Sequence, residues 1–190
     1  MGRKYGALHI RAGNNSEKTD AIVESCINAM NSLFNIDMEK AAGLLDLNLA
    51  LQQIPLLNQL IGAGVYAQTE QKVVRHNGFV SIYDRRMTFE NIQTIALKLS
   101  DLLNLPVFFS SVFDDDVFVF GLCENGKDVS TSISGSCEVY GLKQENDNID
   151  GIERYLSNAE DKSPELKNLS GAELENALSK MLGFRLYLDE

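Results

Sequence analysis

The chain has no tryptophan, three prolines, two histidines and three cysteines among its 190 residues. Cys26, Cys123 and Cys137 have neither the even count of a disulfide framework nor the short spacing of a zinc site. They indicate reduced thiols packed as small hydrophobic side chains. His9 and His76 belong to no metal-spaced cluster and to no nucleophile motif. Each is expected to be a strand residue with a structural hydrogen bond.

Long apolar runs are also lacking. Met1 to Ala12 is interrupted by four basic or histidine side chains where the apolar core of a signal peptide would lie. Leu44 to Val65 contains an aspartate, a proline and several amide side chains, so it cannot form the nearly continuous apolar span that a bilayer requires. We therefore expect a cytoplasmic protein without a membrane segment.

The negative charge is unevenly distributed along the chain. Met1 to Phe113 holds ten Lys/Arg and ten Asp/Glu, whereas Asp114 to Glu190 holds seven against seventeen, which accounts for the net charge of -10. An acidic field repels phosphate backbones and anionic lipid and attracts basic surfaces. With no basic patch elsewhere, the sequence argues against nucleic-acid binding and favours a basic protein partner.

Apolar spacing and caps predict the first elements. Gly6 to Arg11 alternates as a strand does, and a helix follows the cap-forming residues Asn14 to Ser16. One face of that helix is apolar: Ile22, Val23, Cys26, Ile27, Met30, Leu33 and Phe34. Asp37 starts a second helix, and Leu44 to Leu51 alternates as a strand although its propensities favour a helix, which we extend to Ile54.

Two Asn-Gly pairs predict β-hairpins, because both central residues of a type I′ turn need positive φ. They are Asn77-Gly78 and Asn125-Gly126. Counting outward from the second turn pairs Leu122 with Val129, Phe120 with Thr131, and Phe118 with Ile133. These six residues are expected to share one buried sheet face, with a helix from Thr88 to Leu103 packed nearby.

The remaining elements complete an α+β protein. The helix that Thr88 caps lies between two strands and predicts a crossover. Ser170 and Glu173 predict a capping box for a helix that ends before Gly183, and Phe184 to Leu188 is interpreted as a last strand. The expected fold is an antiparallel or mixed sheet packed by amphipathic helices in one compact domain, residues 1–190, with possible sub-units 1–66 (helical) and 67–190 (sheet-containing).

A glycine-rich segment, Gly62 to Ala67, is the closest match to a formal signature. With Asp84 about twenty residues later it has the spacing of a dinucleotide-binding unit. The context disagrees, because a helical pattern precedes it and the Asn77-Gly78 hairpin leaves little room for a helix after it. A helix C-cap with a turn is the favoured interpretation.

Two charged turns could bind ions. Asp114 to Asp116 offers oxygen ligands for a cation, but adjacent side chains on a turn point in different directions, so a solvated turn is favoured. Asp84 to Arg86 could hold an anion near a helix start, and a turn with local ion pairing is favoured instead. Neither NAD(P) nor a divalent metal is expected to bind tightly, and no cofactor is assigned.

Two segments carry a resemblance: Gly78 to Ser130 and Leu169 to Phe184. They contain a strand, an amphipathic helix with a Leu-Ser pair at Leu99, a strand, an Asp-rich turn, a hairpin ending Asn-Gly-Lys, and a late helix ending Leu-Gly. This order resembles small uncharacterised bacterial proteins, some of them immunity proteins of polymorphic toxin systems. The resemblance implies no catalytic residues.

The leading hypothesis is a non-enzymatic module that binds a basic protein, such as a toxin, through an acidic surface. Six acidic residues are expected to lie near one hairpin and form a continuous patch: Asp114, Asp115, Asp116, Glu124, Asp128 and Glu138. The alternative is an enzyme or sensor that binds a nucleotide or a metal-linked ligand at Gly62 to Ala67 or at Asp114 to Asp116. The oligomeric state is left open.

Overall fold

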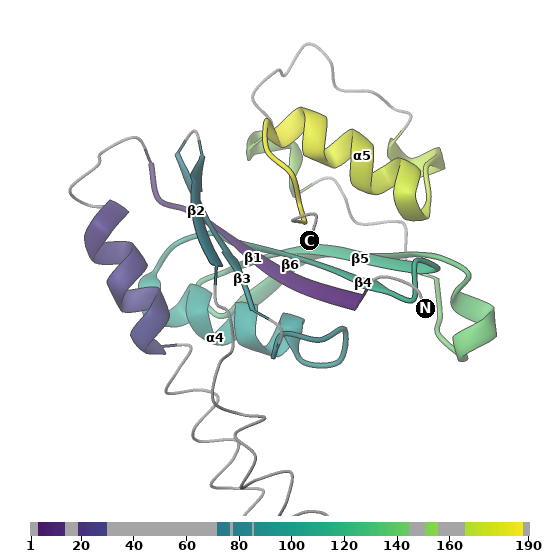
Figure 1. Ribbon diagram of the computed structural model, residues 1–190, viewed down its shortest axis with the longest axis horizontal. Helices are drawn as coiled ribbons and strands as arrows, with labels where there is room; N and C mark the ends of the chain where they lie inside the picture. Colours follow the sequence, from purple (N-terminus) through teal and green to yellow (C-terminus); the bar gives the residue numbers. More distant parts are fainter. Residues whose placement is uncertain are drawn as a thin grey trace, which may run out of the picture.

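A six-stranded antiparallel sheet with helices on both faces forms the described part of the protein, which confirms the α+β fold class (Figure 1). The computed structural model describes residues 4–13, 19–29, 72–76, 78–84, 86–144, 151–155 and 166–187. In chain order the strands are β1 Lys4–Arg11, β2 Lys72–His76, β3 Phe79–Tyr83, β4 Val107–Phe113, β5 Val117–Glu124 and β6 Lys127–Gly135. The sheet order is β2-β3-β1-β4-β5-β6.

The strand β1 lies in the middle of the sheet and pairs antiparallel with both β3 and β4. Strands β3 and β4 are therefore parallel to each other, and α4 (Ile92–Leu103) connects them as the predicted crossover. Both predicted hairpins are confirmed, because His76 pairs with Phe79 and Glu124 pairs with Lys127. Asn125 and Gly126 have φ of 50° and 70°, as a type I′ turn requires.

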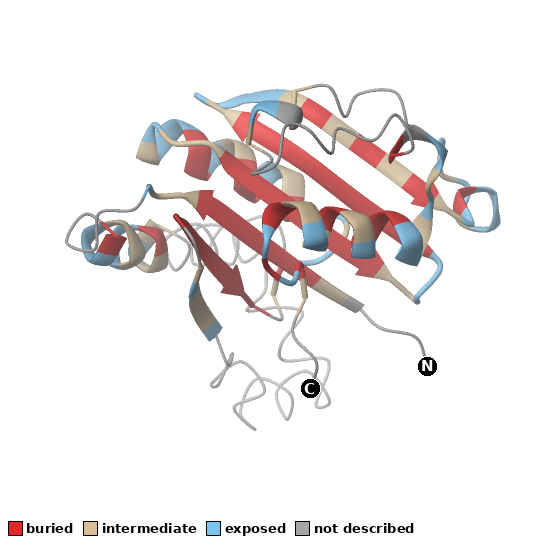
Figure 2. Ribbon diagram, turned by 90° about the horizontal axis from the view of Figure 1, so that it is seen from above, coloured by how far each residue is buried: buried red, intermediate tan, exposed pale blue. Residues whose placement is uncertain are grey.

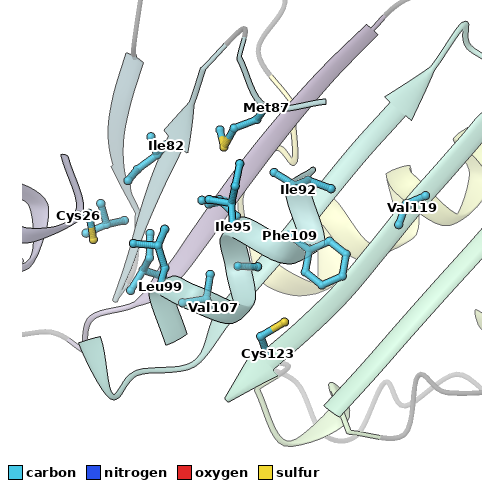
Figure 3. Packing of buried hydrophobic residues seen from close by; sticks show 14 of the residues in the cluster. Cys26, Ile82, Met87, Ile92, Ile95, Leu99, Val107, Phe109, Val119 and Cys123 are labelled. Carbon is cyan, nitrogen blue, oxygen red and sulfur yellow. The ribbon is translucent and has the colours of Figure 1, made fainter. Parts of the chain in front are cut away.

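One face of the sheet packs against α4 and against a helix over residues 19–29, in which Cys26 is buried. Figure 3 shows Ile92, Ile95 and Leu99 of α4 against the strands. Phe109 packs over Gly121 of the neighbouring strand, where a Cβ would lie 2.2 Å from the Phe109 Cζ atom. Gly121 therefore makes the space that the aromatic ring occupies.

The opposite face is covered by α5 (Gly171–Leu182) and by residues 184–187. Its buried apolar side chains form a second core: Phe79, Phe108, Val112, Phe118, Phe120, Leu122, Ile152, Leu166, Leu174, Leu178, Leu182, Phe184 and Leu186. Beyond β6, the described residues include three short 3₁₀ helices: η1 Cys137–Tyr140, η2 Glu153–Tyr155 and η4 Leu166–Asn168. The central strands are buried almost throughout, because both faces are covered (Figure 2).

The predicted register of the second hairpin is wrong by one residue. Leu122 pairs with Ser130, Phe120 with Ser132, and Phe118 with Ser134, because an irregularity between Leu122 and Cys123 leaves Val129 as an extra residue. Phe118, Phe120 and Leu122 are buried as expected, but they face α5 and not α4. Thr131 and Ile133 turn to the α4 face instead, where Ile133 packs against the first core.

The helix starts also differ from the predictions. The helix α4 begins at Ile92 and not at Thr88, because the Asn91 side chain turns back to accept a bond from the Thr88 N–H and to donate one to the Arg86 carbonyl. Ser170 is the N-cap of α5, but its side chain makes no capping bond, so the predicted capping box is absent. Gly183 ends α5 with φ of 76°, as predicted.

The predicted last strand does not form over residues 184–187. This segment crosses the sheet face, and side-chain hydroxyls of the sheet donate to two of its carbonyl groups. Tyr83 Oη donates to the Arg185 carbonyl, and Ser110 Oγ donates to the Leu186 carbonyl. The predicted helices between Asp37 and Ile54 lie outside the described residues. No helix in the described ranges has the length and apolarity needed to cross a membrane.

Candidate functional site

A mostly apolar pocket of about 540 Å³ lies where β1 begins and β4 ends. Its walls come from β1, from the end of β4, from the segment that leads into α4, and from the end of η1 with the segment that follows it. The lining residues are Tyr5, Met87, Thr88, Phe89, Glu90, Val112, Phe113, Tyr140 and Leu142. This volume is within the range of small-ligand sites in proteins.

The wall formed by residues 87–90 is held in place by local packing. Met87 is buried against Gly6, where a Cβ would meet the Met87 carbonyl oxygen at 2.7 Å. The Met87 N–H donates to the Asp84 carbonyl, and Arg86 forms a two-pronged ion pair with the buried Asp84 carboxylate. The predicted local ion pairing of Asp84 and Arg86 is thus confirmed, although Asp84 is buried and not solvated.

Three aromatic rings form one side of the pocket. Phe113 lies between Phe89, with ring centroids 6.2 Å apart, and Tyr140, with centroids 5.0 Å apart and nearly perpendicular planes. Tyr140 Oη donates a hydrogen bond of 2.8 Å to Asp116 Oδ2. This bond, burial, and the charges of Asp116 and Asp114 raise the pKa of Tyr140. The negative charges of Asp114 and Asp116 are therefore felt at the Tyr140 hydroxyl, at the edge of the pocket.

The turn Asp114 to Asp116 adjoins this aromatic wall. Asp114 and Asp115 both have positive φ, at 58° and 62°, which aspartate tolerates better than most residues. The Asp116 N–H donates to the Phe113 carbonyl, and the Ser136 N–H donates to the Asp116 carbonyl. The second bond ties η1 to the turn. It brings Glu138 and Val139, 76% exposed, to the same end of the molecule.

The six predicted acidic residues do not form one patch. Glu124 and Asp128 lie at the far end of β5, about 23 Å from the Asp turn, since a strand rises about 3.3 Å per residue. Glu124 accepts bonds from Arg154 and from the Tyr155 hydroxyl. Asp128 accepts bonds from the Gln93 amide and the Thr131 hydroxyl. Asp114, Asp115, Asp116 and Glu138 remain as the acidic group beside the pocket.

The two histidines both pack against Phe184 on the α5 side of the sheet. His9 is fully buried and bonds Ser81 Oγ at 2.8 Å and Ser110 Oγ at 3.2 Å, which confirms its structural hydrogen bonding. Burial, and secondly the nearby His76, lower the pKa of His9 to about 3. The expected bond of His76 is not found, since its Nε2 is buried without a partner in the described ranges. With both ring nitrogens engaged and no exposure, His9 is a structural residue.

The other predicted sites are simple to place. All three cysteines are free and buried, and burial raises the pKa of Cys26 and Cys123 to about 12. Among the residues that the structure describes, no three His, Cys, Asp or Glu side chains are placed to hold a metal ion. Gly62 to Ala67 lies outside the described ranges, so its interpretation stays a prediction.

No family model, curated protein or solved structure matches this chain. A candidate binding site must therefore be identified from the arrangement of the described residues alone. Sequence reasoning identified the acidic turn but missed Phe89, Glu90, Phe113 and Tyr140, which come from three separate segments. Only the packing of those segments at one end of the sheet reveals the pocket.

Proposed function

We propose that the protein is a non-enzymatic protein-binding module, acting as an immunity protein does, that docks a basic partner at the acidic end. We define the acidic end as the Asp114 to Asp116 turn, η1 and the pocket beside them. One observation carries the proposal: an aromatic-lined pocket of about 540 Å³ adjoins a turn with three consecutive carboxylates. The exposed Val139 extends this surface.

The chemistry of the acidic end suits a protein partner. Protein interfaces combine an apolar, aromatic centre with a polar rim, and the pocket and its carboxylates reproduce that arrangement. A formal charge of -10 for the whole chain adds long-range attraction for a basic partner and repels nucleic acid. The complementary surface is therefore expected to be basic, with apolar side chains at its centre.

Association kinetics with two neutralised variants test this proposal. The partner is recovered by affinity capture with the purified protein, and its association rate is measured by stopped flow at several salt concentrations. In the double variant Asp114→Asn and Asp115→Asn, association should slow several-fold, up to about tenfold, and depend less on salt, because steering charges are lost. Asparagine is chosen because it also tolerates positive φ.

The matched control removes two charges from the other end of β5, in Asp101→Asn combined with Asp128→Asn. Asp101 lies at that end because its side chain packs against Gly126 of the β5–β6 turn. This variant should associate at nearly the wild-type rate, since a distance of about 23 Å exceeds the screening length of about 8 Å at physiological salt. Equal rates for both double variants would contradict docking at the acidic end. Equal thermal unfolding of the three proteins is required for the comparison.

A further inference from the structure

We infer that the pocket at the acidic end binds an arginine side chain. This inference rests on the proposed function, because it names the part of the basic partner that enters the pocket. It is specific to the pocket, however, and can be tested without the partner. The juxtaposition that carries it is a set of three aromatic rings with carboxylates at one edge.

The aromatic rings favour a cation over a neutral apolar group. A cation within about 6 Å of a ring face is attracted by the ring quadrupole, and several rings around one cation act together. Phe89, Phe113 and Tyr140 are successive neighbours with centroids 6.2 and 5.0 Å apart. The planes of Phe89 and Phe113 are inclined by 50° and those of Phe113 and Tyr140 by 87°, so the three rings are not coplanar and can contact one cation from different directions.

The carboxylates supply the charge complement. Glu90 lines the pocket, and Asp116 is fixed at its rim by the 2.8 Å bond from Tyr140 Oη. Since Asp116 uses one oxygen for Tyr140, its other lone pairs can accept further N–H donors. The acidic residues beside the pocket are Glu90 in its lining and Asp114, Asp115, Asp116 and Glu138 of the acidic end. The basic residues that adjoin the lining are Lys4, which pairs with Phe113 in the sheet, Arg86, which is ion-paired with Asp84, and Lys143, which follows Leu142.

Arginine fits these features better than lysine. Its guanidinium is planar, stacks on aromatic faces, is weakly hydrated and presents several donors to carboxylates. An ammonium group is a compact and strongly hydrated point charge, so its transfer into a mostly apolar pocket costs more. The pocket also exceeds the volume of one side chain, which leaves room for a residue next to the arginine.

Blocked amino acids test the inference on the full chain. N-acetyl-arginine amide is titrated by NMR, with the methyl group of Met87 and the ring of Tyr140 as reporters, beside the lysine compound and the citrulline compound. Citrulline has nearly the shape of arginine without the charge. We expect the arginine compound to bind. The affinity of the citrulline compound should be at least about tenfold lower, because it cannot form the charged hydrogen bonds.

Variants locate the site. Phe89→Leu and Glu90→Gln should each weaken arginine binding about three- to fivefold, since each removes one cation contact. Tyr140→Phe should weaken it as well, by releasing Asp116 without removing the ring. The control Glu173→Gln, in the first turn of α5 and far from the pocket lining, should bind as the wild type does.

Three outcomes would overturn the inference: no shift of the two reporters, equal binding of citrulline, or stronger binding of lysine. The proposed function fails separately. Suppose that the arginine compound binds the wild type and not the pocket variants, while the partner associates equally fast with the Asp114 and Asp115 double variant. The pocket assignment then stands, and the docking proposal is wrong. If the partner depends on those aspartates while arginine does not bind, the reverse holds.

Discussion

At the scale of single residues, aromatic side chains fill the centre of the core between the sheet and α5. Phe120 is fully buried between Phe108 and Phe118, with ring centroids 6.0 and 6.3 Å away. We expect Phe120→Ala to lower the free energy of unfolding by about 3 to 5 kcal/mol, since the substitution removes apolar contacts and leaves a cavity. Denaturant titration measures this loss. Leu102→Ala is the control, because Leu102 is 67% exposed and its change should be small.

His9 makes the stability depend on pH. Its pKa is about 6.5 in the unfolded chain and about 3 in the folded protein, mainly because burial disfavours the charged ring. The unfolded chain therefore takes up the proton first as the pH falls. The contribution of His9 to the free energy of unfolding is fully present above about pH 6.5. It decreases by about 1.4 kcal/mol per pH unit as the pH falls to about 3. Burial lowers the pKa of His76 too, which adds to the same trend.

His9→Gln separates this contribution from that of the carboxylates. Glutamine can still bond Ser81 or Ser110 but does not titrate. Between pH 6 and 4, the free energy of unfolding of the variant should fall less steeply than that of the wild type, by about 1.4 kcal/mol per pH unit. Denaturant titrations at each pH measure both slopes. Parallel slopes would show that His9 is not the titrating group.

At the scale of elements, the sequence predicts strands and hairpins better than it predicts faces. Asn-Gly turns fix the first pair of each hairpin, and both turns are found. An irregularity one pair further on, which makes Val129 an extra residue of β6, has no marker in the sequence. Alternation could not correct the error, because β5 is buried on both faces and so has no polar side.

Similar reasons explain the other differences. The end of the chain offers an apolar pattern that suits a strand, yet the hydroxyls of Tyr83 and Ser110 hold its backbone across the sheet face. The acidic turn was evident from three adjacent aspartates. The pocket was not evident from the sequence. Phe89, Phe113 and Tyr140 have the pattern of ordinary core residues, and only the fold brings their segments together.

The serines of β6 are a consequence of the true register. Ser130, Ser132 and Ser134 are buried beneath α5, and the first two hydroxyls have no partner in the described ranges. Ser134 Oγ accepts a bond from the Gly171 N–H. We expect Ser132→Ala to leave stability unchanged or raise it by up to about 1 kcal/mol, because a buried hydroxyl without a partner costs free energy.

Ser134→Ala is the matched comparison. It should lower stability by about 1 kcal/mol, since it leaves the Gly171 N–H without its partner at the start of α5. Thermal and denaturant unfolding of the two variants give the difference. If Ser132→Ala destabilises the protein as much as Ser134→Ala does, the register derived from the pairing of β5 with β6 is incorrect.

At the scale of the whole molecule, folding divides the acidic part of the sequence. The charge excess after Phe113 suggested one acidic surface, but β5 separates the Asp turn from Glu124 and Asp128 by its full length. Composition reports how much charge a segment carries and not where the fold places it. The separation makes each end a control for the other in any binding experiment.

The central position of β1 has a consequence for synthesis on the ribosome. The Ser111 hydroxyl bonds the Tyr5 carbonyl, 106 positions earlier in the chain, and both neighbours of β1 are made long after it. At about 5 to 20 residues per second, β1 waits roughly 5 to 20 s for its last partner strand to be translated. Until β3 and then β4 are made, β1 lacks one or both of its neighbours, so folding of the nascent chain depends on slow, long-range closure while an apolar strand edge is open to aggregation.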